Sequence, residues 1–244
     1  MVIKEHAYED IATPTGPMRT HLFAPQAPGR YPGIVLYSEI YQITGPVRRM
    51  AAFLAGQGFV VSAPEIYHEY EAPGTVLLYD APGTDRGNDL KFTKTVAAYD
   101  SDARAALDQL KAHPSCNGRL GAMGICLGGH LAFRTAMNAD VAAAACFYAT
   151  DIHTGTLGHG DDSLARAGDI KGELLCVWGR QDPHVPLAGR TLIRETLEAA
   201  GADFTWHEFN AAHAFMRDEG LRYDPALAWH CYGLVTELFK RRLG

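Results

Sequence analysis

The stretch Leu120-Gly-Ala-Met-Gly-Ile-Cys-Leu-Gly-Gly-His-Leu131 restricts the fold more than any other part of the chain. It starts as a short apolar run, reaches Cys126 between Gly124 and Gly128, and passes directly into a segment with helical apolar spacing, residues 127–137. This order predicts a strand, a sharp turn and a helix. The two glycines allow the strand and the helix to approach closely at the turn, where side chains would block them.

Cys126, at the tip of this turn, is a candidate nucleophile. A residue at this point projects beyond the carboxyl end of its strand and over the N-terminus of the next helix, whose N–H groups favour a negative charge. A thiolate is therefore favoured there. The alternative is a small buried cysteine in a glycine-rich junction, and only partners elsewhere in the chain can separate the two interpretations.

Composition narrows the class of protein. The chain has 244 residues, of which 47% are hydrophobic and 20% charged, and this predicts a single globular domain over residues 1–244. A net charge of −6 argues against nucleic acid or an anionic membrane as a partner, but it leaves a small anionic substrate possible. The five cysteines are widely spaced and contain no Cys-x-x-Cys pair, so we expect neither a disulfide framework nor a zinc knuckle.

We expect no secretory signal and no membrane span in these residues. Residues 1–6 do not form the apolar core of a signal peptide, and no apolar run approaches the ~20 residues of a membrane span. We therefore expect a cytoplasmic protein with no membrane partner, and a monomer by default.

Strand and helix patterns alternate along most of the chain, after an N-terminal segment that predicts an antiparallel edge hairpin. Strands are expected at residues 34–37, 59–63, 120–125, 141–148, 174–178 and 204–209, and helices at 46–57, 90–112, 127–137, 187–200 and 225–242. Apolar strands that alternate with helices predict an α/β fold, with a mostly parallel central sheet and helices on both faces. Three tryptophans at strand or helix positions, Trp178, Trp206 and Trp229, are expected in the core.

Four polar residues follow the ends of predicted strands: Glu39, Cys126, Asp182 and His213. Ligand sites in parallel sheets lie beyond these ends, so we expect the four side chains to converge. The order of nucleophile, acid and histidine is that of the α/β-hydrolase triad. In this interpretation Asp182 orients His213, and His213 acts as the base for Cys126.

Each partner has an alternative. Asp182 could be a turn residue before Pro183, and His213 could be a loop histidine without a role. His184 is a rival base in the same loop as Asp182, although we rank it below His213.

The chain resembles the dienelactone hydrolase family of α/β-hydrolases over nearly its whole length. The motifs that carry the resemblance are Gly124-Ile-Cys-Leu-Gly-Gly, Ser38-Glu-Ile-Tyr, Gly179-Arg-Gln-Asp-Pro-His-Val-Pro and Ala212-His-Ala-Phe-Met-Arg. A cysteine in place of the commoner elbow serine, together with a glutamate after the third strand, makes the match specific. The resemblance implies the α/β-hydrolase fold and a single catalytic domain.

The resemblance also implies roles for single residues. Glu39 would hold the resting thiol and help to remove its proton when substrate binds, although it could instead be an ion-pair partner for an arginine. The backbone N–H groups of Ile40 and Leu127 would form the oxyanion hole, and Arg217 would bind a substrate carboxylate. The segment that should supply a second positive charge, residues 83–92, departs from the family pattern, and Arg86 is only a candidate for it.

These inferences predict a cysteine-dependent hydrolase of small esters or lactones, carboxylate-bearing ones included, that works through a thioester at Cys126. No metal or organic cofactor is required. Two alternatives stay open: a non-catalytic binding or thiol-sensing protein on the same scaffold, and an enzyme of acyl or thioester transfer.

Two further loops are expected to rim the site, residues 65–71 and 153–162. A metal site in the second loop is disfavoured because its ligand spacing matches no known geometry. His130, on the predicted elbow helix, is expected to be a packed or solvated side chain rather than a ligand.

Overall fold

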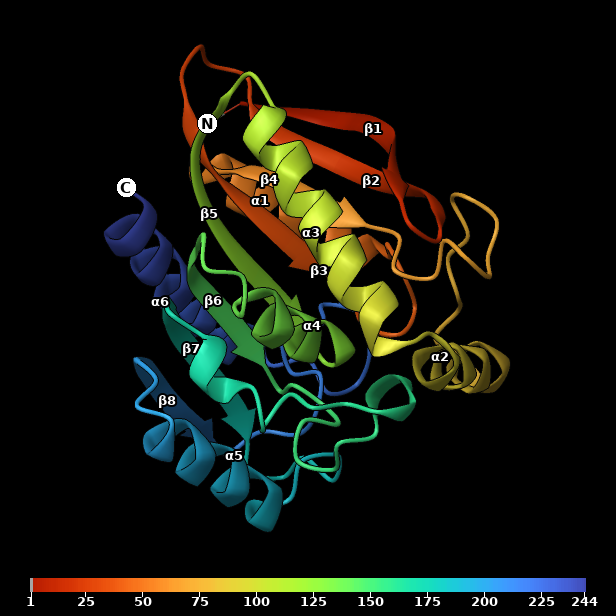
Figure 1. Ribbon diagram of the computed structural model, residues 1–244, viewed down its shortest axis with the longest axis vertical. Helices are drawn as coiled ribbons and strands as arrows, with labels where there is room; N and C mark the ends of the chain where they lie inside the picture. The colour runs from red at the N-terminus through yellow and green to blue at the C-terminus, as the bar shows by residue number, and fades with distance from the viewer. Residues whose placement is uncertain (1) are drawn as a thin grey trace.

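The computed structural model describes residues 2–244, so Met1 of the N-terminal segment lies outside the described residues. These residues form one eight-stranded sheet with the order β1-β2-β4-β3-β5-β6-β7-β8 (Figure 1). The strands are β1 (Ile3–Thr13), β2 (Gly16–Pro25), β3 (Tyr31–Tyr37), β4 (Val60–Pro64), β5 (Cys116–Ile125), β6 (Val141–Phe147), β7 (Glu173–Gly179) and β8 (Phe204–Phe209). β1 and β2 pair antiparallel, as do β2 and β4, and the other pairs are parallel. The mostly parallel sheet and the N-terminal edge hairpin are both confirmed.

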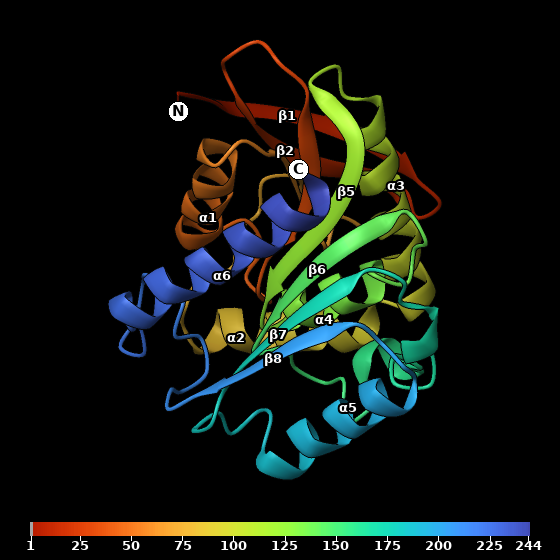
Figure 2. The same ribbon diagram turned by 90° about the vertical axis from the view of Figure 1, so that its left-hand side faces the viewer.

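Helices cover both faces of this sheet. They are α1 (Gly45–Gly56), α2 (Ala81–Thr93), α3 (Val96–Ala112), α4 (Leu127–Thr135), α5 (Leu187–Ala199) and α6 (Pro225–Leu243), with 3₁₀ turns at η1 (Leu157–His159) and η2 (Ala167–Asp169). Figure 2 shows α1 and α6 on one face of the sheet and α3, α4 and α5 on the other. Each face has its own apolar core, one containing Leu107, Leu131 and Ile193 and the other Met50 and Leu238. Because the strands are buried on both faces, their sequences are nearly continuously apolar.

The predicted helix at residues 90–112 is divided in two. α2 ends at Thr93 and α3 begins at Val96, and Thr95 caps α3 by accepting the N–H of Ala98 at 3.2 Å. Lys94 between them is extended and fully buried, and its ammonium lies 2.5 Å from Asp102 and 2.6 Å from Glu69. A buried ammonium needs such partners. The predicted helix is therefore interrupted at Lys94, where this charge enters the interior.

α2 begins at Ala81, well before the helix predicted at residues 90–112. Asp80 caps it by accepting the N–H of Gly83 at 2.8 Å, and Pro82 lies in its first turn. Both are ordinary helix-start signals. This boundary decides which residues α2 presents to the site.

The prediction that all three tryptophans are core residues is wrong for one of them. Trp178 is buried and Trp206 is partly buried, but Trp229 is 72% exposed. α6 turns Ala228, Cys231 and Val235 inward, so Trp229 faces outward. None of the helices within residues 2–244 has both the length and the apolarity that crossing a membrane requires.

Candidate active site

A cavity of about 280 Å³ opens beyond the carboxyl ends of the parallel strands. Five of the predicted site residues line it: Glu39, Ile40, Cys126, His213 and Arg217. The other lining residues are Tyr41, Thr84, Asn88, Lys91, Thr150, Asp151, His184 and Arg222. Of these eight, His184 was considered for the site from the sequence, as a rival base, and the other seven were not predicted. The convergence expected from the strand ends is therefore present.

Cys126 sits at the tip of the turn between β5 and α4. Its backbone has φ 57° and ψ −123°, a conformation that is strained for a residue with a side chain. A Cβ at Gly124 would overlap the carbonyl of Gly128, so the strand and helix could not meet this closely with a larger residue. The Cys126 N–H donates to the Phe147 carbonyl at 3.0 Å, which anchors the tip to β6. The turn presents the thiol to the cavity, as the sequence pattern predicts.

Leu127, the other elbow residue of interest, is the first residue of α4. The N–H groups of a first helical turn have no acceptor within the helix. Its N–H is therefore placed at a positive helix end beside the thiol, where an anion is favoured.

Asp182 and His213 meet in the position that the triad requires. His213 Nδ1 lies 2.7 Å from Asp182 Oδ2, and both residues are buried. Asp182 Oδ1 also accepts the backbone N–H of His184 at 2.8 Å. Burial raises the pKa of the Asp182 carboxyl, but the hydrogen bond and charge of His213 lower this pKa by more, and the net shift is downward. The carboxylate is thus held ionised behind the imidazole.

His213 and Cys126 line the same cavity, and a charge on the sulfur acts on the imidazole. Burial alone would lower the pKa of His213, but a negative charge on the Cys126 sulfur, together with the Asp182 carboxylate, raises it to about 10. Because Nδ1 faces Asp182, Nε2 is the nitrogen left for the sulfur. His213 thus lies between Asp182 and the side of the cavity that Cys126 lines.

His184, the rival base, is an exposed residue whose ring centroid lies 4.6 Å from that of His213. Its hydrogen bond to Asp182 is made by its backbone N–H, whereas His213 uses its ring. Burial of the ring and the charge of His213 lower the pKa of His184. The geometry therefore supports His213 as the partner of the thiol.

Glu39 follows β3 and is buried. Its Oε1 lies 3.6 Å from Nη1 of Arg217, and its Oε2 accepts a hydrogen bond from the Tyr79 hydroxyl at 3.2 Å. Burial raises the pKa of Glu39, although the charges of Arg217 and His213 and the Tyr79 hydrogen bond oppose this. The ion pair with an arginine, left open by the sequence, is thus present.

The structure does not bring Arg86 to the cavity. Its guanidinium lies 2.7 Å from Glu71 and 3.2 Å from Asp89, and its side chain is 44% exposed. α2 presents Thr84, Asn88 and Lys91 to the cavity instead. These three are spaced by four and three residues and so share one face of the helix, a face that does not include Arg86.

Lys91 is the cation that α2 contributes to the cavity, and it was not predicted from the sequence. It is nearly buried, and its Nζ lies 3.0 Å from Asp151 Oδ2. Burial raises the pKa of Asp151, but the charge of Lys91 and hydrogen bonds lower this pKa by more, so the net shift is downward. With Arg217 and Arg222, three cationic side chains line the cavity. The helical spacing from Thr84 was the signal that could have found Lys91.

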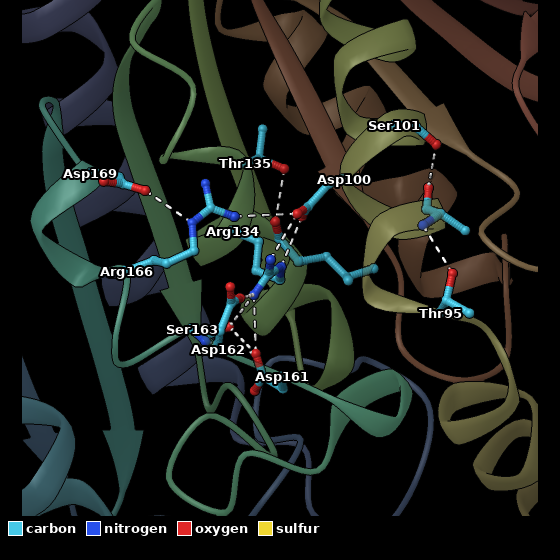
Figure 3. A network of polar contacts seen from close by, with 12 residues as sticks. Thr95, Asp100, Ser101, Arg134, Thr135, Asp161, Asp162, Ser163, Arg166 and Asp169 are labelled. Carbon is cyan, nitrogen blue, oxygen red and sulfur yellow. Dashed lines mark hydrogen bonds and ion pairs between the residues drawn. The ribbon is translucent and has the colours of Figure 1, made fainter.

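The loop after β6 touches the cavity through Thr150 and Asp151 and then returns to α4. Figure 3 shows Asp161, Asp162 and Ser163 of this loop beside Arg134 of α4. There Arg134 contacts Asp162 at 2.8 Å and Asp161 at 3.1 Å, and His130 Nε2 lies 2.7 Å from Ser163 Oγ. His130 is fully buried, which confirms the packed alternative. The two aspartates, expected near the rim, bind Arg134 instead. Residues 65–71 contribute none of the cavity-lining residues described.

Two groups of side chains have donor atoms close enough for a metal ion. One is His68, Glu69 and Asp102, and the ammonium of Lys94 already lies among them. The other is Asp182, His184 and His213, which is part of the arrangement around the thiol. Lys94 thus occupies the centre of the first group, and Asp182 and His213 of the second group are paired with each other.

The chain is similar in sequence to known proteins. The sequence model of the "Dienelactone hydrolase family" matches residues 18–243. A protein of Saccharomyces cerevisiae named "Putative carboxymethylenebutenolidase" is 44% identical over 100% of this chain and 93% of its own. The "Carboxymethylenebutenolidase" of Pseudomonas putida is 30% identical over 81% of this chain and 80% of its own.

A solved structure has the same fold. The "Crystal Structure of Putative Dienelactone Hydrolase" from Klebsiella pneumoniae superposes with a TM-score of 0.84 at 21% identity, over 99% of this chain and 100% of that one. At this identity the likeness concerns the fold, which is that of the α/β-hydrolases. The family match and the relatives together show that the chain belongs to the dienelactone hydrolase family.

Proposed function

We propose that this protein is a cysteine-dependent hydrolase of small esters or lactones. The observation that carries the proposal is the meeting of three side chains at the cavity. Cys126, at a strained elbow, lines the same cavity as His213, and His213 Nδ1 lies 2.7 Å from Asp182 Oδ2. A nucleophile, a base and a group that orients the base are the arrangement needed for acyl transfer.

In the first half of the reaction, the Cys126 thiolate attacks the carbonyl carbon of the substrate. The carbonyl electrons move to its oxygen, and the N–H groups of Ile40 and Leu127 stabilise the resulting oxyanion. When the C–O bond to the leaving group breaks, the oxyanion collapses to a thioester. The leaving alkoxide or enolate takes a proton from the His213 imidazolium.

In the second half, water hydrolyses the thioester. Neutral His213 takes a proton from the water while the hydroxide attacks the acyl carbon, and the carboxylic acid leaves as the thiolate is restored. Asp182 keeps the Nδ1 proton of His213 in place throughout, so that Nε2 faces the reacting atoms. Each step uses groups of this chain, the substrate and water.

Glu39 gives the cycle a dependence on the substrate's charge. At rest the Arg217 cation is one of the groups that oppose the upward pKa shift of Glu39. A substrate carboxylate that binds Arg217 weakens this effect and makes Glu39 a stronger base. Glu39 can then take the proton of the Cys126 thiol, so the reactive thiolate forms beside the His213 imidazolium when substrate is present, and Glu39 returns the proton to the sulfur once the product acid has left.

We propose that the substrate is a small ester or lactone that carries a carboxylate. Relatives of the chain are named carboxymethylenebutenolidase, and the cavity is lined by Lys91, Arg217 and Arg222. Arg217 is proposed for the carboxylate because it lies beside Glu39. Arg86 is not proposed for it, since it is engaged outside the cavity.

The thioester is the intermediate that tests this function. A panel of lactones, enol esters and p-nitrophenyl acetate should be hydrolysed, and rapid acid quenching during turnover should trap an acyl group on the protein. Trypsin cleaves after Arg119 and Arg134, and the resulting peptide contains Cys126 as its only cysteine. The acyl group should map to this peptide. Turnover with the label on another peptide, or with none, would remove Cys126 from the role of nucleophile.

The position of Ile40 yields a second test. A Cβ on Gly87 of α2 would lie 2.6 Å from the Ile40 carbonyl oxygen and 2.9 Å from its Cβ. Gly87→Ala should therefore displace the Ile40 backbone and its N–H, and kcat should fall by about 10²-fold. Alanine favours a helix over glycine, so α2 itself should not be weakened.

The matched control is Gly56→Ala, because a Cβ on this helical glycine of α1 meets nothing within 4 Å. Steady-state kinetics and thermal melts of both variants separate the outcomes. Wild-type kcat in the Gly87→Ala protein would contradict the role of Ile40 in the oxyanion hole.

A further inference from the structure

Tyr79 lies outside the cavity lining and carries none of the predicted roles, yet it contacts two groups that the proposed function uses. Its hydroxyl is 3.2 Å from Glu39 Oε2, and its ring centroid lies 4.3 Å from Cζ of Arg217. Tyr79 comes from the loop between β4 and α2, whereas Glu39 follows β3 and Arg217 follows β8. One side chain thus joins two residues from separate parts of the chain.

We propose that Tyr79 is a positioning residue that holds Glu39 with its hydroxyl and Arg217 with its ring. This inference rests on the proposed function, because it concerns the base and the carboxylate-binding cation of the same cavity. Tyr79 does not touch the reacting atoms in this proposal. It sets where the two groups stand when substrate arrives.

The hydroxyl contact has a defined direction. An ionised carboxylate can only accept, so the Tyr79 hydroxyl donates to Glu39. The same oxygen lies 2.9 Å from Thr44 Oγ1, and the Thr44 hydroxyl can donate to it in turn. Thr44 is the residue that precedes α1. A chain of two hydrogen bonds thus connects the buried carboxylate to the start of a helix packed on the sheet.

The ring contact acts on the other group. A guanidinium over a tyrosine face is attracted by the ring quadrupole, and more strongly where water is excluded. Arg217 has only 12% of its side chain exposed, and its Nε also donates to the Glu219 carbonyl at 2.8 Å. Tyr41 packs edge-on against Tyr79, with 4.6 Å between the ring centroids, and so fixes the ring that Arg217 covers.

The two contacts together have a consequence for catalysis. When a substrate carboxylate engages Arg217, Glu39 loses part of its electrostatic support in a buried position. The Tyr79 hydroxyl then remains as a donor that keeps the carboxylate ionised. The charged and titratable groups that act on Glu39 from the neighbouring elements include Arg217, His213, Tyr79, Arg222 and Tyr148. Of these, Tyr79 is the neutral donor that an anionic substrate does not compete for.

Two substitutions separate the two contacts. Tyr79→Phe removes the hydroxyl and keeps the ring, and Tyr79→Leu removes both. The substrates are p-acetoxybenzoate, which carries a carboxylate, and phenyl acetate, which does not. Kinetics are measured from pH 5 to 10 as ~0.5-unit steps, and Cys126 alkylation by iodoacetamide gives a readout that needs no turnover.

For Tyr79→Phe, we expect the acidic limb of kcat/KM and of alkylation to move up by about one pH unit, with KM for p-acetoxybenzoate within about twofold of wild type. For Tyr79→Leu, KM for p-acetoxybenzoate should rise about fivefold while KM for phenyl acetate stays the same. The control is Tyr31→Phe, which removes an exposed hydrogen bond to the Ala27 carbonyl. It should match wild type in all measurements.

Two results would overturn the inference: an unchanged acidic limb in Tyr79→Phe, or an equal rise of both KM values in Tyr79→Leu. If the leucine variant is unstable, Tyr79→Phe still tests the inference, since this variant loses a single oxygen atom and should fold. If Cys126 carries no acyl group in wild type, the proposed function fails. If it does carry one and Tyr79→Phe behaves as wild type, the inference about Tyr79 alone fails.

Discussion

The Cys126→Ala protein is expected to hydrolyse esters about 10⁶-fold more slowly than wild type, with its fold unchanged. The reason is that the sulfur forms the covalent intermediate, and the oxyanion hole and binding contacts that remain give only a small residual rate. The residue is half-buried at a turn, so loss of the thiol removes little packing. Initial rates with p-nitrophenyl acetate, corrected for the rate in buffer, measure the effect.

The other cysteines provide the control. Cys116, Cys146, Cys176 and Cys231 are buried, and of these Cys116 lies at the start of β5, the opposite end of the strand from Cys126. Cys116→Ala should keep wild-type turnover. Iodoacetamide should also inactivate the wild-type and Cys116→Ala proteins alike, because Cys126 is the more accessible thiol. Undiminished turnover by Cys126→Ala would refute the enzyme mechanism proposed here.

The elbow was readable from the sequence because its constraints are local. Gly124 and Gly128 flank Cys126 at a spacing that permits one kind of turn, and the structure shows the close contact that forbids a larger residue at Gly124. Asp182 and His213 were also placed correctly, since each follows a strand and the carboxyl ends of parallel strands share one edge. Strand ends thus predict which residues converge.

The pairing between loops could not be read in the same way. Glu39 and Arg217 both lie at strand ends, but the sequence does not say whether the carboxylate faces a thiol or a guanidinium. The structure shows the contact with Arg217, and Tyr79 from a third loop completes it. Contacts between loops depend on how far each loop folds back, and no periodic pattern records that.

The helix before α3 shows how one boundary error spreads. The sequence pattern predicts a single helix over residues 90–112, which leaves the cavity-facing side of α2 unassigned. Arg86 was therefore a candidate for its charge alone. Once Asp80 is recognised as the cap, the spacing from Thr84 puts Lys91 on the cavity side. The break itself is tertiary in origin, because buried Lys94 needs Asp102 and Glu69.

Asp182→Asn should lower kcat/KM by about 10⁴-fold while it leaves the shape of the loop intact. The asparagine oxygen can still accept the His184 N–H, which now lies 2.8 Å from Oδ1. Its NH₂ group would then face His213 Nδ1, which is 2.7 Å from Oδ2 in the wild type. A donor at that point forces Nδ1 to accept, so the ring proton moves to Nε2 and the base cannot take a proton at the site of reaction.

The substitution should also change the pH dependence. The Asp182 carboxylate is one of the groups that raise the pKa of His213 to about 10, so its loss should lower that pKa and move the alkaline limb of kcat/KM to lower pH. Asp203→Asn is the matched control, because Asp203 is an exposed partner of Arg242 away from the cavity. Full pH–rate profiles of the three proteins make the comparison. If Asp182→Asn stays within about tenfold of wild type with an unmoved alkaline limb, then Asp182 does not orient His213 and the base must be held by another group.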